Sequence, residues 1–238
     1  MKLSVVVPMY NARNIVENLK DIVKSLKKFI DDFEIIVVND GSSNNCYNDA
    51  KKFKDKHVKI VGYKKNSGKG NALKYGVRFA KGDHIAFLDE GGDLSASQLK
   101  NFLEILKDEN GDIVIGSKRH SESNVRYPAI RRLMSRTYQT LNRILFNLKV
   151  KDTQVGIKLF KREVLERILP LILIKKFAFD LELLVVANKF KYKIIEAPIS
   201  LEYKFESTIN TSAVFWILID TAAIFYRLKI LRWYDGEA

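Results

Sequence analysis

Short apolar runs alternate with segments of helical period along the chain up to residue 117. The runs predict buried strands at 3–7, 34–38, 58–61, 85–88 and 112–116, and the segments between them predict helices at about 14–30, 48–56, 72–80 and 95–106. This alternation favours parallel pairing, because a helical crossover returns the chain to the same end of the sheet. We therefore expect an α/β fold with a Rossmann-like, mostly parallel central sheet and helices on both faces.

The chain of 238 residues carries 41 Lys and Arg against 28 Asp and Glu, which gives a formal net charge of +13. Such a charge favours an anionic partner, namely a phosphorylated substrate, an anionic membrane surface or nucleic acid. We do not expect nucleic acid, because neither a zinc or RNA-recognition motif nor an interleaved pattern of stacking aromatics accompanies the basic residues. Cys46 is the only cysteine in the sequence, so a reducing, cytoplasmic compartment is expected.

Carboxylates and glycines follow the predicted strand 85–88, in the sequence Asp89-Glu90-Gly91-Gly92-Asp93. Ligands of parallel α/β sheets bind beyond the carboxyl ends of the strands. Asp89 and Asp93 are therefore candidates for holding a hard divalent cation next to a phosphate-bearing ligand. The alternative is a solvated loop with ordinary turn aspartates.

Polar loops follow two of the other predicted strands. Asp40, after the run 34–38, either accepts hydrogen bonds from a ligand or serves as a turn and helix-cap residue. The loop 64–71 places Lys69 between two glycines at a helix start, where backbone N–H groups and a lysine can hold phosphate. A solvated turn is the alternative, because the loop lacks the spacing of a Walker A motif.

The segment after residue 117 is rich in basic residues. They are either a solvated helix face or an anion site, and their clustering makes the anion site at least as plausible. Asp180 and Glu182 begin a predicted helix at 178–190, where the helix dipole alone explains two acids. Short strands are expected at 192–196 and 201–205. The basic cluster comprises Lys118, Arg119, Arg126, Arg131, Arg132, Arg136 and Arg143.

The stretch 207–226 contains one charged residue, Asp220. Its length fits a bilayer span, but a carboxylate at mid-bilayer costs about 2.5–3.5 kcal/mol. Aromatic and basic side chains continue to Trp233, a mixture that suits the lipid headgroup zone. We expect an amphipathic segment on an anionic membrane surface, in preference to a span or to packing on the protein core. The predicted division is a domain at 1–206 and a membrane-associating tail at 207–238.

Seven short motifs, in this order, resemble those of family 2 glycosyltransferases, and most of all the polyprenyl-phosphate and dolichyl-phosphate hexosyltransferases. The resemblance covers nearly the whole chain. It implies a GT-A fold with a nucleotide-binding half at about 1–116 and an acceptor half at about 117–206. The motifs are Val7-Pro8-Met9-Tyr10-Asn11, Val38-Asn39-Asp40-Gly41-Ser42, Gly68-Lys69-Gly70, Leu88-Asp89-x-x-x-Asp93-Leu94, Gly116-Ser117-Lys118, Asp152-Thr153-Gln154-x-Gly156-x-Lys158-Leu159-Phe160 and Phe179-Asp180-x-Glu182-Leu183.

The resemblance also implies roles for the matched positions. Asp89 would be the first acid of a site for Mg²⁺ or Mn²⁺, and Asp93 or a backbone oxygen near Gly91 would replace the second, which the family places closer. Arg131 joins these acids as a catalytic residue. The implied donor-binding residues are Pro8, Tyr10, Asn11, Val38, Asp40, Gly41, Ser42, Lys69, Gly70, Asp89, Glu90 and Lys204. The implied acceptor-phosphate residues are Lys118, Arg119, Arg131 and Arg132, supported by Asp152, Gln154, Asp180 and Glu182.

The implied reaction is inverting transfer of a hexose from a nucleotide sugar to a polyprenyl or dolichyl phosphate at the inner, cytoplasmic membrane face. A UDP-glucose-like donor is favoured over GDP-mannose, because the motifs at 68–70 and 152–154 look more like the glucosyl branch. The alternatives are a family 2 enzyme with a soluble or glycan acceptor, a non-catalytic homologue and a basic nucleic-acid-binding module. The oligomeric state stays open.

Overall fold

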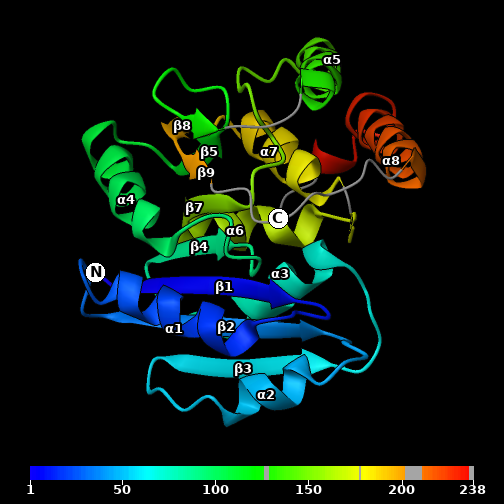
Figure 1. Ribbon diagram of the computed structural model, residues 1–238. Helices are drawn as coiled ribbons and strands as arrows, with labels where there is room; N and C mark the ends of the chain where they lie inside the picture. The colour runs from blue at the N-terminus through cyan, green and yellow to red at the C-terminus, as the bar shows by residue number, and fades with distance from the viewer. Residues whose placement is uncertain (126–128, 177, 202–210, 236–238) are drawn as a thin grey trace.

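A seven-stranded sheet with strand order β3-β2-β1-β4-β7-β5-β8 forms the middle of the computed structural model (Figure 1). The structure describes residues 1–125, 129–176, 178–201 and 211–235, and at 129–135 and 211–213 it describes the backbone alone. β1 to β4 pair in parallel, as the alternation of strands and helices predicts. The strands are β1 Leu3–Met9, β2 Phe33–Asp40, β3 Val58–Tyr63, β4 His84–Leu88, β5 Ile113–Ser117, β7 Ile157–Lys161 and β8 Ile194–Pro198.

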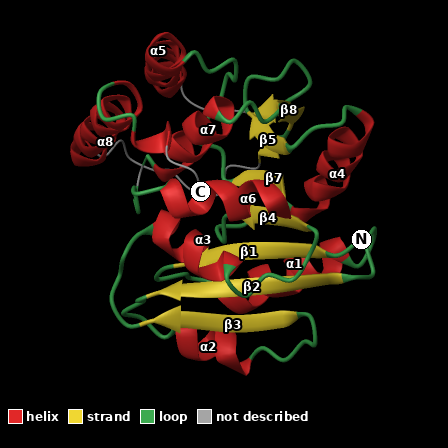
Figure 2. Ribbon diagram, turned by 180° about the vertical axis from the view of Figure 1, so that it is seen from behind, coloured by secondary structure: helices red, strands yellow, loops and turns green. Residues whose placement is uncertain are grey.

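Helices cover both faces of the sheet (Figures 1 and 2), which confirms the expected α/β class. Successive side chains of a strand point to opposite faces, so Val5 and Val7 enter one core while Val6 enters the other. The first face carries α1 Ile15–Leu26, α2 Cys46–Lys52, the 3₁₀ turn η1 Ala96–Gln98 and α4 Leu99–Asp108. The second carries α3 Lys69–Val77, α6 Arg162–Ile168, the 3₁₀ turn η2 Leu169–Leu171 and α7 Phe179–Lys189.

The strand β7 does not appear among the predicted strands. It runs antiparallel between β4 and β5, with Phe87 opposite Lys158 and Ile113 opposite Phe160. β8, close to the predicted strand at 192–196, then pairs in parallel with β5. Because β7 lies directly beside β4, it brings the preceding loop 152–156 to the carboxyl end of β4.

The helices α5 Ala129–Phe146 and α8 Thr211–Lys229 lie outside α7 on the second face (Figures 1 and 2). The hydroxyl groups of Tyr138 and Thr221 lie 3.0 Å apart and join these two helices. A small second sheet pairs β6 Asn124–Val125 with β9 Ser200–Leu201. The predicted boundary at 206/207 and most of the predicted strand 201–205 lie outside the described residues.

The helix α8 has one side on the core and one side in solvent. Ile224 of α8 and Tyr234 of the 3₁₀ turn η3 Trp233–Asp235 are buried in the second core, whereas Phe215 and Trp216 are more than half exposed. One side of α8 therefore packs on the protein core, which is one of the alternatives for this segment, and the other side does not. Within the described ranges, no helix combines the length and apolar character that a membrane crossing requires.

Candidate active site

A cavity of about 750 Å³ opens where the carboxyl ends of β1, β2 and β4 meet. Its walls come from the residues after these strands, from the start of α3 and from the start of α7. This is the edge at which parallel α/β sheets bind ligands. We call it the first cavity; its lining residues are Pro8, Met9, Tyr10, Asp40, Asn66, Gly68, Lys69, Asp89, Glu90, Gly91, Asp93, Gln154, Lys176 and Asp180.

Asp89 follows β4 directly, and its neighbours fix its position. Its backbone N–H donates a hydrogen bond to the carbonyl oxygen of Gly156 at 3.0 Å. A Cβ atom on Gly156 would collide with the Asp89 carboxyl group, so only glycine allows this close approach. Lys69 places its Nζ atom 2.6 Å from Asp89 Oδ1. The loop before β7 and the start of α3 therefore together orient this carboxylate.

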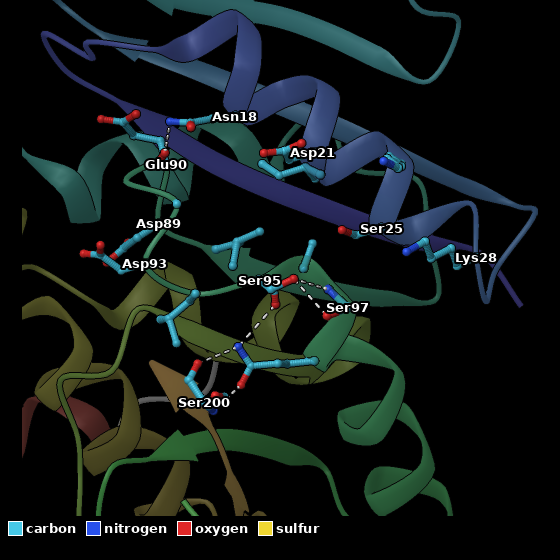
Figure 3. Close-up of a pocket in the computed structure, with 17 residues that line it drawn as sticks. Asn18, Asp21, Ser25, Lys28, Asp89, Glu90, Asp93, Ser95, Ser97 and Ser200 are labelled. Carbon is cyan, nitrogen blue, oxygen red and sulfur yellow. Dashed lines mark hydrogen bonds between the residues drawn. The ribbon is translucent and has the colours of Figure 1, made fainter. Parts of the chain in front are cut away.

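The loop from Asp89 to Asp93 turns back on itself, with Gly92 in the left-handed region at φ +72°. Asn18 of α1 fixes the loop by donating its Nδ2 hydrogen to the carbonyl oxygen of Glu90 at 2.6 Å. Asp89 and Asp93, at the two ends of this loop, both line the first cavity, and both are labelled in Figure 3. Burial raises the pKa of Glu90 above its ordinary value.

The pair of Asp89 and Asp93 suits a divalent cation that a substrate also helps to coordinate. Mg²⁺ in phosphate sites is usually held by one or two carboxylates together with substrate phosphates and water. Among the described residues, no group of three or more His, Cys, Asp or Glu side chains is placed to hold a metal ion. Asp89 and Asp93 offer two carboxylates to a divalent cation, whose other ligands a bound substrate and water would supply.

A second cavity of about 220 Å³ adjoins the first and shares Asp89, Gly91, Asp93 and Gln154 with it. Its other lining residues are Leu94, Lys118, Val155, Gly156, Ile199 and Leu201. The Lys118 ammonium lies 3.3 Å from Oδ2 of the buried Asp152, so it stays anchored at the cavity wall. A cation set among apolar side chains suits an anion that carries an apolar group.

A third cavity of about 540 Å³ lies on the other side of the 89–93 loop, between α1 and η1 (Figure 3). Asp21, Ser25 and Lys28 of α1 form one wall. Opposite them, the Gln98 amide donates to the Ser200 carbonyl oxygen at 3.0 Å and accepts from the Ser200 N–H at 2.8 Å. The 89–93 loop thus borders all three cavities.

Comparison with known proteins identifies the family. Residues 4–169 match the family described as Glycosyl transferase family 2. The chain belongs to this family. Glucosyl-3-phosphoglycerate synthase of Mycobacterium tuberculosis has the same overall fold, with a TM-score of 0.68 at 17% identity over 94% of this chain and 80% of that chain.

Two similar family 2 members are dolichyl-phosphate beta-glucosyltransferases. The Saccharomyces cerevisiae protein is 31% identical over 220 residues, which cover 83% of this chain and 66% of the yeast protein. The human protein is 30% identical over 247 aligned residues, which cover 97% of this chain and 76% of the human protein. The match thus spans just under two thirds of the yeast relative.

Asp40, which the family resemblance assigns to the donor, lines the first cavity and also holds a loop. Its carboxylate accepts hydrogen bonds from the N–H groups of Ser67 at 2.7 Å and Gly68 at 2.9 Å, and from the Asn66 amide at 3.1 Å. These bonds fix the loop that leads into Lys69. The ligand-binding and turn-forming alternatives for Asp40 are therefore compatible, because one carboxylate borders the cavity and organises its wall.

Several other matched donor residues support the loops and do not line the first cavity. Asn11 donates its N–H to Ser42 Oγ at 3.0 Å and accepts from the Ser43 N–H at 2.8 Å, which joins the loops after β1 and β2. Gly41 has φ +66°, and a Cβ atom there would collide with the backbone at 64–66. These residues therefore join the loops after β1 and β2, and their donor contacts stay predictions.

Val38 and Gly70 also lie away from the first cavity. The Val38 side chain is completely buried in the second core, and a Cβ atom on Gly70 would collide with the ring of Phe179. Both positions therefore pack α3 against its neighbours, and their donor role stays a prediction. Sequence position alone does not reveal this, because a residue at a strand end can point to the cavity or to the core.

The acids at the start of α7 have partners beyond the helix dipole. Asp180 lines the first cavity and accepts a hydrogen bond from the buried Lys158 ammonium at 2.7 Å. Burial alone would raise the pKa of Asp180, but Lys158 and Lys69 hold it below its ordinary value. Glu182 is completely buried and bonded to Arg227 and Tyr234, so its predicted supporting role is structural.

Three of the predicted anion-binding side chains lie outside the described residues. Arg131 and Arg132 belong to the described backbone of α5, but their side chains do not, and Lys204 falls in the undescribed range 202–210. Arg119 donates its backbone N–H to Ser117 Oγ at 3.3 Å. The phosphate-binding roles of Arg119, Arg131, Arg132 and Lys204 stay predictions.

Gly156 and Lys176 are among the site residues that are missing from the predicted set. Gly156 touches Asp89, and Lys176 lines the first cavity. Gly156 belongs to the motif at 152–160, where a glycine just before an apolar run signals close backbone approach. Lys176 has no such signal, because its position depends on how the segment between η2 and α7 folds back.

Proposed function

We propose that this chain is an inverting glycosyltransferase that moves glucose from a UDP-glucose-like donor to a polyprenyl or dolichyl phosphate. The observation that carries the proposal is that two cavities of different chemistry share Asp89 and Asp93. Relatives named dolichyl-phosphate beta-glucosyltransferase support the sugar and the acceptor.

The first cavity has the features of a donor site. The loops after β1 and β2, the start of α3 and the 89–93 loop all border it. A structure of the M. tuberculosis synthase in complex with Mn²⁺ and UDP-glucose supports a UDP-sugar and a divalent cation here. Asp89 and Asp93 would hold Mg²⁺ or Mn²⁺, which when bound would stabilise the negative charge on the leaving diphosphate.

The second cavity suits the acceptor. Lys118 offers a positive charge to the lipid phosphate, and the side chains of Leu94, Ile199 and Leu201 offer apolar contact to the first part of the lipid chain. Arg131 and Arg132, from α5, are proposed to add positive charge on this side. The shared wall at Asp89 and Asp93 then lies between the two reacting groups.

The reaction needs little proton transfer. An acceptor phosphate oxygen attacks the anomeric carbon of the sugar while the bond from that carbon to the diphosphate oxygen breaks, and UDP leaves with the electron pair. A phosphate monoester with a second pKa near ~6 is mostly dianionic at neutral pH, so it is already a nucleophile. The side chains contribute by holding the acceptor phosphate and the donor diphosphate in line with the anomeric carbon.

The exposed side of α8 and the residues after it suit a membrane surface. Apolar and aromatic side chains there mix with the cations Lys229 and Arg232, as in segments that lie in the headgroup zone of anionic bilayers. We propose that this surface, which we call the α8 face, holds the enzyme on the cytoplasmic side of a membrane. Its exposed apolar residues are Phe215, Trp216, Leu218, Ile219, Tyr226, Ile230, Leu231 and Trp233.

A transfer assay tests the proposal. The full chain is incubated with radiolabelled UDP-glucose or GDP-mannose and with polyprenyl phosphate in anionic vesicles, with Mn²⁺, Mg²⁺ or EDTA. We expect label in the lipid extract with UDP-glucose and metal, and loss of this label in Asp89→Asn. Asp21→Asn, which changes an acid of the third cavity, is the matched control and should keep activity. Equal transfer to a water-soluble sugar would contradict the lipid acceptor.

A further inference from the structure

Lys69 lies between two carboxylates of the first cavity. Its ammonium forms an ion pair of 2.6 Å with Asp89 Oδ1, and it also interacts electrostatically with Asp180. Asp180 is itself held by the buried ammonium of Lys158 at 2.7 Å. Acids and cations thus alternate in the order Asp89, Lys69, Asp180, Lys158 across the floor of the cavity. Burial alone would lower the pKa of Lys69, but Asp89 and Asp180 hold it above its ordinary value.

This arrangement places Lys69 in competition with a metal ion. A divalent cation at this site would be held by the carboxylate of Asp89. The Lys69 ammonium already lies at hydrogen-bond distance from Oδ1 of the same carboxylate. Two cations this close together repel strongly in a partly buried site. Lys69 and a metal ion therefore compete for the negative charge of the same carboxylate.

Lys69 has an alternative partner inside the same cavity once a donor is present. It is the first residue of α3 and lines the first cavity together with Gly68, so a bound diphosphate would lie within reach of its flexible four-carbon stem. Asp180 stays on the other side of the ammonium and needs no rearrangement, because Lys158 holds it in place.

We propose that Lys69 couples metal binding to donor binding: it balances the charge of Asp89 until a nucleotide diphosphate enters, then pairs with the diphosphate and releases Asp89 to the cation. This inference rests on the proposed function, because it assumes a nucleotide diphosphate and a divalent cation in the first cavity. Thermodynamic linkage then requires UDP and Mn²⁺ to raise each other's affinity by the same factor.

The test measures Mn²⁺ binding directly, by the electron paramagnetic resonance signal of free Mn²⁺, with and without saturating UDP. In wild type, Mn²⁺ alone should bind weakly and UDP should tighten it. Lys69→Met should tighten the binding of Mn²⁺ alone by about tenfold and reduce the effect of UDP by a similar factor. Lys69→Arg, which keeps the charge, should restore most of the coupling.

Lys65→Met is the matched control. Lys65 precedes Lys69 by four residues, is exposed and is not among the residues that line the first cavity. This variant removes the same charge and should leave the effect of UDP on Mn²⁺ close to that of wild type. Thermal melting of each variant confirms that it is folded, and Lys69→Gln serves as a second neutral variant if Lys69→Met is not.

The outcomes separate the inference from the proposed function. If UDP tightens Mn²⁺ equally in wild type and Lys69→Met, or if Lys65→Met loses as much coupling as Lys69→Met, the coupling role is overturned while the donor and metal site stands. If wild type binds no Mn²⁺ even with UDP, both the coupling role and metal-dependent transfer are overturned.

Discussion

Tyr234 donates a hydrogen bond to Glu182 Oε1 at 2.6 Å and so joins the end of the described chain to the start of α7. The Arg227 guanidinium donates to the same oxygen at 2.8 Å. The other carboxylate oxygen accepts the N–H groups of Leu173 at 3.0 Å and Ile174 at 2.7 Å. Glu182 is completely buried. Burial removes the water molecules that would solvate its carboxylate, which costs much free energy unless other donors take their place. These four donors do so.

We predict that this network stabilises the C-terminal segment. Glu182→Gln should lower the free energy of unfolding by about 3–5 kcal/mol, because it leaves the partly buried Arg227 without its counter-charge. Tyr234→Phe removes one hydrogen bond to a charged group and should cost about 1.5–3 kcal/mol. Urea denaturation measures both, with the half-exposed Tyr226→Phe as control. A Glu182→Gln effect no larger than that of the control would contradict the role of the network.

The buried pair of Asp180 and Lys158 predicts a specific pH dependence. Lys158 and Lys69 hold the pKa of Asp180 below its ordinary value despite burial, so its stabilising effect is present above the unfolded-state pKa of about 3.9 and is lost as the pH falls through the folded-state pKa. Asp180→Asn should therefore cost about 3–5 kcal/mol at pH 7 and less at pH 3. Urea denaturation of both proteins at the two pH values checks this, and an equal difference at both would refute it.

The contact of Gly156 with Asp89 predicts that a larger residue at position 156 displaces the Asp89 carboxyl group and slows catalysis. Gly156→Ala forces the new methyl group against the Asp89 carboxyl and should displace it, which we expect to lower kcat/KM for glucose transfer by about 100-fold. Gly91→Ala is the control, because Gly91 lines the second cavity, as Gly156 does, and a Cβ atom there would meet nothing closer than 3.9 Å. Steady-state kinetics of both variants decide, and similar losses in the two would contradict the specific role of the Gly156 contact.

The proposed acceptor site predicts that a substitution there changes the KM values of the two substrates differently. Lys118→Met should raise the KM for polyprenyl phosphate by about tenfold and leave the KM for UDP-glucose nearly unchanged, because only the acceptor loses its counter-charge. Charge reversal in Arg131→Glu should act in the same direction. Lys24→Met, in the third cavity, is a control for loss of surface charge. Equal increases in both KM values would contradict a role of Lys118 that is specific to the acceptor.

The α8 face predicts membrane affinity that depends on lipid charge. Phe215→Ser and Trp216→Ser should each weaken binding to phosphatidylglycerol vesicles by roughly tenfold, because each removes a large exposed apolar side chain. Co-sedimentation at low salt measures this, with phosphatidylcholine vesicles as the uncharged comparison. Wild-type protein that stays in the supernatant with anionic vesicles would remove the basis for this proposal.

The sequence predicts the part of the fold up to residue 117 well, because the signals there are local. The apolar runs of β1, β2 and β4 and the acids that follow them are visible as continuous patterns, and parallel pairing brings their ends together. The positions of Asp89, Asp93 and Lys69 around one cavity follow from these local signals and from the family resemblance.

The remainder depends on contacts between distant residues, which no local pattern encodes. β7 follows a polar loop and joins the sheet between strands that precede it by many residues. Glu182 resembles a helix-dipole acid until Arg227 and Tyr234 are seen to meet it. Asp40 resembles a ligand-binding acid, although its carboxylate also binds the loop at 66–68.

The insertion of β7 between β4 and β5 also constrains the order in which the sheet can assemble during synthesis. β1 to β4 can pair with one another as soon as residue 88 has left the ribosome, because their partners are all in place. β5 pairs within the sheet with β7 and β8, so it has to wait for residues 157–161 before it can join. During that interval the β4 edge and the β5 segment are both exposed, and this is when a nascent chain of this topology most needs protection from aggregation.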